Sequence, residues 1–288
     1  MTRLVSFEVS ADFGFFKKPD INKIGLTYNL PPKPAILGLL GSILGLKGHK
    51  QHYEENAMKK ENVQSFPEYC SKLAHLKIGI TPLGDFPFNK IMNKYNSKNS
   101  YYYTRTDSGS RVDTGNIIEQ LLIKPRFRLY LFTNKDIDKL FDKLVSNISN
   151  NCSIYTPYLG KNDFILTINN FSKEDLGGHS NFKEYSLKPK IKIKTIFLMN
   201  QANINQKNMA EEFPTPIIMN VEGLNKDEYG KPVIDKDFRE NYPIGYLDSS
   251  LQYNLKLARY TTFEVIKEQI DTEEGILLEN DKEMVYLF

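Results

Sequence analysis

Four histidines are the first candidates for chemistry, because imidazole is the commonest general base and metal ligand in proteins. His49 and His52 are three residues apart, and on a helix both rings would lie on one face near Glu55. A two-histidine, one-carboxylate metal site also needs supporting groups, and a solvated helix face explains the same pattern more simply. His75 follows a helical pattern, and His179 lies in a glycine turn. We therefore predict no metal site and no cofactor.

Motifs of nucleotide or serine chemistry are absent from the sequence. The segment GLLGSILG, residues 38–45, contains glycines but lacks the Lys and the Ser or Thr of a phosphate-binding loop. No serine elbow and no dinucleotide fingerprint occurs. Cys70 and Cys152 stand outside any CxxC or His-bearing cluster, which argues against a structural zinc site and a disulfide scaffold. Classical enzyme motifs are therefore absent, and we assign no catalytic residue.

The strongest chemical signal is a basic segment rich in tyrosine. Residues 89–128 hold eight Lys and Arg against three Asp and Glu, and Tyr101, Tyr102 and Tyr103 stand together at its centre. Basic groups neutralise phosphates, and aromatic rings stack on unpaired bases with about 1 to 3 kcal/mol per base. This combination favours single-stranded RNA as a partner. The alternative is a hairpin whose tyrosines pack on the body and whose lysines are only solvated.

The formal net charge of +3 conceals a division of charge along the chain. Residues 1–206 hold 29 basic and 18 acidic side chains, whereas residues 207–288 hold 9 and 17. A basic body favours a polyanionic partner, although abundant Lys on a solvated surface produces the same count. The charge division predicts two regions of different character that meet near residue 206.

Hydrophobic periodicity predicts the elements that must position these residues. Period-two alternation predicts a strand over Leu4–Ser10, and Pro34 fits the first turn of an apolar helix. Gly38, Gly41 and Gly45 would let another backbone approach that helix closely. Further helices are predicted over Pro67–Leu76 and Asn134–Ile148, and further strands over Lys77–Thr81, Ile117–Lys124, Phe127–Phe132, Asp163–Asn169 and Pro189–Leu198.

Two of these segments carry additional signals. The helix over Asn134–Ile148 has the clearest period in the chain, with Thr133 or Asn134 as its expected cap. The strand over Pro189–Leu198 alternates lysines with Ile191, Ile193 and Thr195, so one face should be apolar and the other basic. In the acidic region, strands are predicted over Tyr260–Lys267, Gly275–Glu279 and Glu283–Phe288.

The order of these elements predicts an α+β fold. Residues 1–206 would form a ferredoxin-like or RRM-like module, interrupted by a long excursion at about 85–115, and residues 207–288 a smaller, mainly β region. No secretory signal is visible, and the longest apolar stretch, Ala35–Leu46, is too short to span a bilayer. We expect a cytoplasmic protein without a membrane partner.

Three segments resemble the CRISPR-associated family-five proteins, the subunits of Cascade complexes that hold the 5′ handle of the crRNA. The first is Thr27-Tyr28 followed by PPKPAILGLLGSILGLKG, which is similar to the family's Pro-rich approach to a Gly-rich first helix. The second is YTPYLGKNDF over Tyr155–Phe164, similar to the family's Tyr-Leu-Gly segment. The third is EEFPTPI over Glu211–Ile217 with VYLF at residues 285–288, which looks like members of subtype I-B.

This resemblance implies an RRM-like fold of the RAMP superfamily with a β-hairpin thumb inserted at about residues 85–115. It implies a non-catalytic RNA-binding subunit that grips the crRNA 5′ handle, caps a filament of backbone subunits and contacts the large subunit. Target DNA is then reached through the crRNA complex. Transferred to the matched segments and the thumb, the resemblance implies RNA contacts by Arg105, Arg111, Lys161, Lys33, Asn29, Tyr158, Lys98 and Tyr102.

Two alternative functions remain open on the sequence. Relatives in subtype I-C process crRNA precursors as metal-independent endoribonucleases with Tyr, Lys and His, where a base deprotonates the 2′-hydroxyl. This chain has Tyr28 and Lys33, but residues 76–178 contain no histidine, so one in or just after the thumb is missing. His49 or His52 would have to serve instead. A scaffold that binds only proteins is the other alternative.

Overall fold

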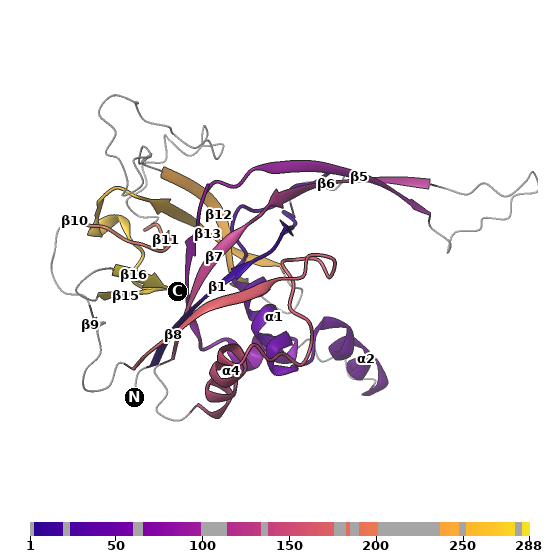
Figure 1. Cartoon of the computed structure of the whole chain (residues 1–288), viewed down its shortest axis with the longest axis horizontal. Helices are drawn as coiled ribbons and strands as arrows, with labels where there is room; N and C mark the ends of the chain where they lie inside the picture. The colour runs from indigo at the N-terminus through magenta and orange to yellow at the C-terminus, as the bar shows by residue number, and fades with distance from the viewer. Residues whose placement is uncertain are drawn as a thin grey trace, which may run out of the picture.

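The structure, a computed structural model, describes most of the chain. The described residues are 3–19, 24–59, 66–98, 114–133, 138–175, 183–184, 190–200, 237–247, 252–279 and 284–288. Within them the protein is a mixed α+β fold rich in antiparallel strands, and a long two-stranded ribbon projects from its body (Figure 1). The predicted α+β class is confirmed.

The central sheet has four antiparallel strands in the order β4-β7-β1-β8. These strands are β1 (Arg3–Ser10), β4 (Lys77–Pro82), β7 (Arg126–Thr133) and β8 (Thr167–Asp175). Strand β1 keeps its predicted alternation, because Val5, Phe7 and Val9 are at most 1% exposed. Apolar residues at every second position thus place one face of the sheet against the core.

Helices α1 (Lys33–Leu44) and α4 (Lys139–Ser149) cover the same side of this sheet (Figure 1). They are in contact, since the Asn147 side chain of α4 donates a hydrogen bond to the Ile43 carbonyl of α1 at 3.1 Å. Pro34 lies in the first turn of α1, as predicted. Helices α2 (His49–Lys59) and α3 (Glu68–Leu73) follow along the chain.

The close approach predicted at the glycines of α1 is made by a side chain of α3. A Cβ atom at Gly41 would lie 2.6 Å from the Cβ atom of Tyr69, so glycine is required for this packing. At Gly38 the same ring would be in ordinary contact, at 3.8 Å. A second backbone also approaches this helix near its end, as predicted, because the N–H groups of Ile154 and Tyr155 donate to the Ile43 and Ser42 carbonyls at 3.3 and 3.0 Å.

Two predicted elements begin later in the structure. Helix α4 begins at Lys139 rather than Asn134, because the Asp138 carboxylate caps it by accepting a hydrogen bond from the Phe141 N–H at 3.0 Å. Thr133 is the last residue of β7 and not a cap. Strand β8 begins at Thr167 rather than Asp163, because residues 158 and 165 form an isolated bridge that closes a turn first.

The projecting ribbon consists of β5 (Lys90–Lys98) and β6 (Thr114–Ile123). The two strands pair antiparallel from Lys90 opposite Leu122 to Lys98 opposite Thr114, and in Figure 1 they extend well away from the central sheet. The short strands β2 (Phe13–Gly14) and β3 (Ile24–Gly25) pair with the base of β6. We call this pair of long strands the β5–β6 ribbon.

The remaining strands form three small sheets. They are β9 (Lys183–Glu184), β10 (Lys190–Ile191), β11 (Phe197–Leu198), β12 (Asp237–Tyr246), β13 (Tyr253–Thr261), β14 (Val265–Ile266), β15 (Ile276–Glu279) and β16 (Met284–Leu287), with a 3₁₀ turn at Lys267–Gln269. The orders are β10-β14, β11-β13-β12 and β16-β15-β9. The predicted strands over Gly275–Glu279 and Glu283–Phe288 are confirmed as β15 and β16.

Two strands predicted as continuous are divided in the structure. Pro189–Leu198 forms β10 and β11, and Tyr260–Lys267 contains the end of β13 and then β14. The reason is that the two halves of each segment pair in different sheets, so the chain must turn between them. The predicted apolar face is present even though the strand is divided, because Ile191, Ile193 and Thr195 are all buried.

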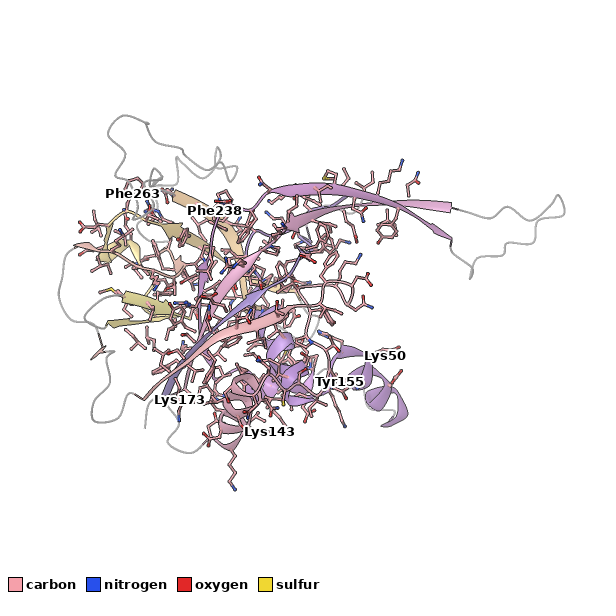
Figure 2. The ribbon with its side chains drawn as sticks, in the orientation of Figure 1. Lys50, Lys143, Tyr155, Lys173, Phe238 and Phe263 are labelled. Atoms are coloured by element: carbon pink, nitrogen blue, oxygen red, sulfur yellow. The ribbon has the colours of Figure 1, made fainter. Side chains whose placement is uncertain are left out.

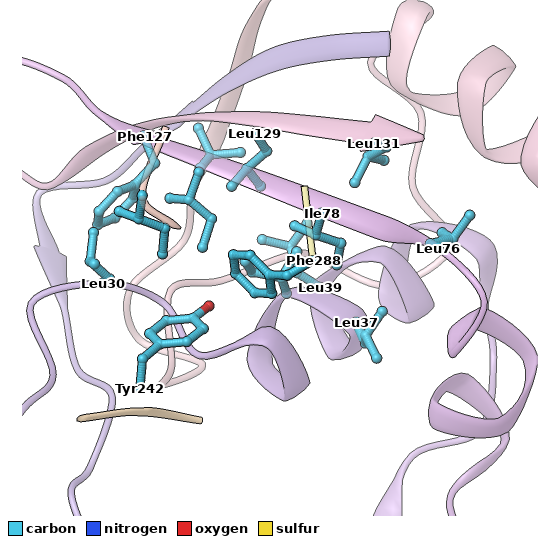
Figure 3. Close-up of a cluster of buried hydrophobic side chains, with 14 of the residues drawn as sticks. Leu30, Leu37, Leu39, Leu76, Ile78, Phe127, Leu129, Leu131, Tyr242 and Phe288 are labelled. Atoms are coloured by element: carbon cyan, nitrogen blue, oxygen red, sulfur yellow. The ribbon is translucent and has the colours of Figure 1, made fainter. Parts of the chain in front are cut away.

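One hydrophobic core joins segments from both ends of the chain. Tyr242 of β12 and Phe288 lie among Leu30, Leu39 and Ile78 in Figure 3, and all of these side chains are buried. The backbone of Phe288 exchanges two hydrogen bonds with Ile78, at 2.9 and 3.0 Å, along the edge of β4. The predicted boundary at residue 206 lies outside the described residues.

A buried carboxylate fastens β12 to the segment before α1. Glu240, 5% exposed, accepts hydrogen bonds from the backbone N–H of Asn29 at 3.1 Å and from its side-chain amide at 3.3 Å. The ammonium of Lys18 lies 2.6 Å from the same carboxylate. Two residues further along β12, the Tyr242 hydroxyl donates to the Pro31 carbonyl at 2.7 Å. Strand β12 and the N-terminal segment are thus held together through a carboxylate that is buried from water.

Replacing Glu240 should test this attachment. Glu240→Ala leaves the buried amide of Asn29 and the ammonium of Lys18 without their acceptor, and we expect the free energy of unfolding to fall by about 3 kcal/mol. Urea denaturation followed by circular dichroism measures the change. Glu54→Ala is the control, since its carboxylate is half exposed and lies 3.8 Å from Lys50. Equal stabilities of the two variants would contradict the assignment.

Candidate nucleic-acid interface

The Tyr-Leu-Gly segment is a turn fixed on the N-terminal part of the chain. The Leu159 carbonyl accepts a hydrogen bond from the Phe15 N–H at 3.1 Å, and the Leu159 side chain is buried. Gly160 has φ 84°, and a Cβ atom there would lie 1.7 Å from the Phe15 carbonyl oxygen. Only glycine fits this left-handed position against a neighbouring backbone. The turn therefore sets where the flanking residues Tyr158 and Lys161 stand.

Lys161 connects this turn to the base of the β5–β6 ribbon. Its ammonium lies 2.7 Å from the Glu119 carboxylate of β6 and 3.5 Å from the Tyr95 hydroxyl of β5. The same ammonium lies over the rings of Phe15 and Tyr95, at 5.7 and 5.2 Å from their centroids. Burial disfavours the charge, but the hydrogen bond and attraction of Glu119 outweigh burial and raise the pKa of Lys161. The residue is thus a fixed cation at the base of the ribbon.

The two faces of the ribbon differ in character. Lys90, Met92 and Lys94 alternate along β5 and so share one face of the ribbon, whereas Tyr95 belongs to the other. Lys94 and Met92 are exposed. Since Tyr95 is the ring that meets Lys161, the opposite face is the one that carries Lys90 and Lys94.

Beside the turn lies a cavity of about 580 Å³. Its walls come from one face of α1, the start of α2, Tyr69 of α3, the Tyr155–Gly160 turn and the β12–β13 hairpin. Tyr155 and Lys50, which both line it, lie near α1 and α2 on the same side of the body in Figure 2. Two of the three segments that carry the family resemblance, the one that contains α1 and the one over Tyr155–Phe164, therefore meet at this cavity.

His49 is the titratable imidazole of the cavity wall. Its Nε2 lies 2.8 Å from the Tyr69 hydroxyl, and its ring meets the Tyr69 and Tyr246 rings edge-on. Burial, followed by repulsion from His52, lowers the pKa of His49, so the ring is neutral at pH 7. Burial also raises the pKa of the Tyr69 hydroxyl, which keeps it protonated. The pair therefore presents uncharged hydrogen-bonding groups to the cavity.

Lys33 and Asn29 engage other parts of the chain. The Lys33 ammonium donates to the Phe288 carbonyl at 3.0 Å and lies 5.8 Å from the centroid of the Phe288 ring. Burial, with repulsion from Lys77 and in spite of attraction by Glu274, lowers the pKa of Lys33 to about 8. Asn29 is 3% exposed and binds Glu240.

The other predicted RNA-binding residues occupy different positions. Tyr158 is 44% exposed and lines the cavity, next to the fixed turn. Lys98 ends β5, opposite Thr114. Arg105, Arg111 and Tyr102 lie outside the described residues. The structure thus brings Tyr158 and Lys161 together at one turn and places Lys98 further out along the ribbon.

Sequence reasoning missed the cavity itself. Tyr246 and Tyr253, which form one of its walls, belong to β12 and β13, and β12 was not predicted. The sequence offers one sign of this wall, which is a pair of tyrosines seven residues apart. Gly245 and Asp248 lie close to this pair. Within the described ranges, no group of three His, Cys, Asp or Glu side chains is placed to hold a metal ion. No helix in the same ranges is long and apolar enough to cross a membrane.

The fold and this site define a mixed α+β protein with a projecting ribbon, one face of which carries lysines, and a cavity beside the turn that Lys161 joins to this ribbon. The family described as CRISPR-associated protein (Cas_Cas5) matches residues 4–222 of the sequence. The chain therefore belongs to the Cas5 family of CRISPR-associated proteins. A search of curated proteins found no match.

The solved structures to which this chain is similar share little sequence identity with it. A chain of a "CRISPR RNA-guided surveillance complex" is 12% identical, with 92% of each chain covered and a TM-score of 0.44. A "CRISPR protein from Archaeoglobus fulgidus" is 14% identical, with 99% of each chain covered and a TM-score of 0.41. A chain of a "Type III-B Cmr-beta" complex bound to target RNA is 12% identical, covering 92% of this chain and 86% of that one, with a TM-score of 0.41.

Substituting Gly160 should show how firmly the turn is fixed. In Gly160→Ala the new methyl group meets the Phe15 carbonyl and adds a steric clash to the strain of a left-handed backbone. We expect the free energy of unfolding to fall by about 3 kcal/mol, measured by urea denaturation. Gly84→Ala is a matched control, because Gly84 has φ 78° but nothing within 4 Å of an added Cβ. It should cost only about 1 kcal/mol, and equal effects of the two substitutions would refute the clash.

Proposed function

We propose that this chain is the crRNA-binding subunit of a type I Cascade complex, of subtype I-B, and that it binds the 5′ handle without catalysis. The proposal rests mainly on one observation: two segments that resemble the family meet at one cavity, and the second is joined through Lys161 to a ribbon with lysines on one face. Membership of the Cas5 family supports a role in a CRISPR complex. Phosphates of the handle would be held by lysine and arginine, and its bases by the cavity side of the turn.

The architecture supports an RRM-like RAMP domain with a thumb. The sheet order β4-β7-β1-β8, with α1 after β1 and α4 after β7, follows the strand–helix–strand–strand–helix–strand order of ferredoxin-like modules. In this proposal the β5–β6 ribbon is the stem of the thumb, and residues 1–206 are the RAMP domain. Residues 207–288 form the second, mainly β region, whose strands β12 to β16 pack against that domain.

The proposed RNA contacts fall into two groups. Arg105, Arg111, Lys98 and Tyr102 belong to the thumb, where cations neutralise phosphates and the tyrosine ring stacks on a base. Tyr158 and Lys161 flank the fixed turn at its base. Lys33 and Asn29 contribute by shaping the segment that leads into α1, since each is bonded within the chain.

The proposed partners follow from the same assignment. The subunit would cap one end of the filament of backbone subunits, contact the large subunit, and reach target DNA through the crRNA. A chain that binds only proteins would copurify with the backbone subunits but would protect no handle nucleotides. Nuclease footprinting of the crRNA in the assembled complex separates these two roles.

Filter binding of a repeat-derived 5′ handle tests the main proposal. Affinity should fall steeply with salt, because bound phosphates displace counterions. The double variant Arg105→Ala with Arg111→Ala should bind about tenfold or more weakly. Its salt slope should be smaller by about 1.4, or about 0.7 for each phosphate that the variant no longer neutralises.

The control removes the same charge from another surface. Lys139→Ala with Lys143→Ala deletes two exposed cations of α4, and Lys143 points away from the body in Figure 2. This variant should bind the handle with nearly unchanged affinity. If both double variants bind like the unmodified chain, Arg105 and Arg111 do not bind the handle.

A second candidate function is endoribonucleolytic processing of the crRNA precursor. One observation favours it: His49, neutral and hydrogen-bonded to Tyr69, faces a cavity that Lys50 also lines. A neutral imidazole can deprotonate a 2′-hydroxyl, and an ammonium can stabilise the charge that develops on the phosphate.

Incubation with precursor RNA in EDTA decides between binding and processing. We expect the RNA to stay intact, because the chain lacks a histidine in or just after the thumb. Gel analysis of end-labelled RNA is the measurement. Cutting at one site that disappears in His49→Ala would establish the processing activity, whereas cutting that persists in the variant would point to a contaminating nuclease.

A further inference from the structure

We propose that the cavity beside α1 binds one nucleobase, turned out of the RNA strand, in a slot with an aromatic wall. This inference deepens the handle-binding function and rests on it. The cavity volume of about 580 Å³ falls within the range of about 300 to 1,000 Å³ typical of small-molecule sites. The space is therefore large enough for one base with its ribose.

The aromatic wall is a stack of nearly parallel rings. The Tyr246 ring lies between Phe66 and Tyr253, with centroid distances of 6.2 and 5.4 Å and interplanar angles of 17° and 13°. Tyr246 and Tyr253 both line the cavity. A flat base inserted here continues a stack that the protein has already built, so little side-chain ordering is needed on binding.

The polar groups of the cavity suit the edge of a base. The His49–Tyr69 pair, the Ser42 hydroxyl and the Thr156 side chain all line it. None of the described residues that line the cavity is Asp or Glu, and Lys50 is exposed at the first turn of α2. A phosphate attached to the base would therefore meet a cation and no carboxylate among these residues.

An apolar side chain of a protein partner would fit this cavity less well. Apolar residues such as Leu39 and Leu46 line it together with five tyrosines and Thr156, so an aliphatic group would match only part of the wall. Burying polar groups without partners costs free energy, whereas a base supplies donors and acceptors around its rim. The chemistry of the wall thus favours a base over an aliphatic anchor.

Photocrosslinking locates the base directly. Each position of the handle RNA is replaced in turn by 5-iodouridine, the complex with the full chain is irradiated, and crosslinked peptides are identified by mass spectrometry. We expect one or two handle positions to crosslink to cavity residues, foremost Tyr253, Tyr246 or Tyr155. This readout uses the unmodified protein and so does not depend on whether a variant folds.

Two variants measure the contribution of the slot. Ala35→Leu fills the cavity from the wall of α1 and keeps the aromatic wall intact, and Tyr253→Leu removes a stacking ring but keeps apolar bulk. Each should weaken handle binding by roughly 5- to 150-fold, the range that corresponds to the stacking of one base. Tyr53→Leu is the control, because Tyr53 is 75% exposed and does not line the cavity. An abasic nucleotide at the crosslinking position should weaken binding of the unmodified chain by a similar factor.

The possible results separate this inference from the proposed function. A chain that binds no handle RNA overturns the function and the slot together. A chain that binds the handle, but crosslinks only outside the cavity and tolerates Ala35→Leu, keeps the function and overturns the slot. Crosslinks in the cavity together with weaker binding by both variants, but not by Tyr53→Leu, establish it.

Discussion

The architecture depends on one buried carboxylate whose hydrogen-bond partners lie more than 200 residues away in the sequence. Glu240 takes its donors from Asn29 and Lys18, and an unpaired charge at this depth would cost several kcal/mol. The position of β12 is therefore coupled to the segment that leads into α1. Tyr246 at the end of β12 and Tyr253 at the start of β13 both line the cavity. The carboxylate that fixes β12 therefore also fixes this aromatic wall.

A second constraint acts on the ribbon. Two antiparallel strands are marginally stable in water by themselves, so the β5–β6 ribbon needs support at its base. Strands β2 and β3 supply hydrogen bonds to β6, and Lys161 supplies an ion pair with Glu119 together with contacts to Tyr95. Gly160 holds Lys161 in place through its contact with Phe15. These contacts therefore hold the fixed turn and the ribbon in one position relative to each other.

Local pattern was sufficient to predict part of this structure. Alternation located β1, and the helical period located most of α4, because in each case one face of the element is buried in the core. The start of α4 was missed because the capping preference of Asp138 is shared by several neighbouring residues. Strand β12 was missed because Pro243 and Gly245 weaken its pattern and because Glu240, a charged residue, points inward. The cavity needs residues from many separate segments, and the sequence contains no sign that these segments lie close together.

The distribution of the cavity walls along the chain has a consequence for biosynthesis. A ribosome releases residues in order, and N-terminal parts fold as they emerge. The walls from α1, α2 and the Tyr155–Gly160 turn are made early, but the tyrosine stack is completed only after Tyr253 has been synthesised. In the proposed function, the nascent chain would therefore expose its basic ribbon to cellular RNA well before it can hold a base in the slot, which needs Tyr253.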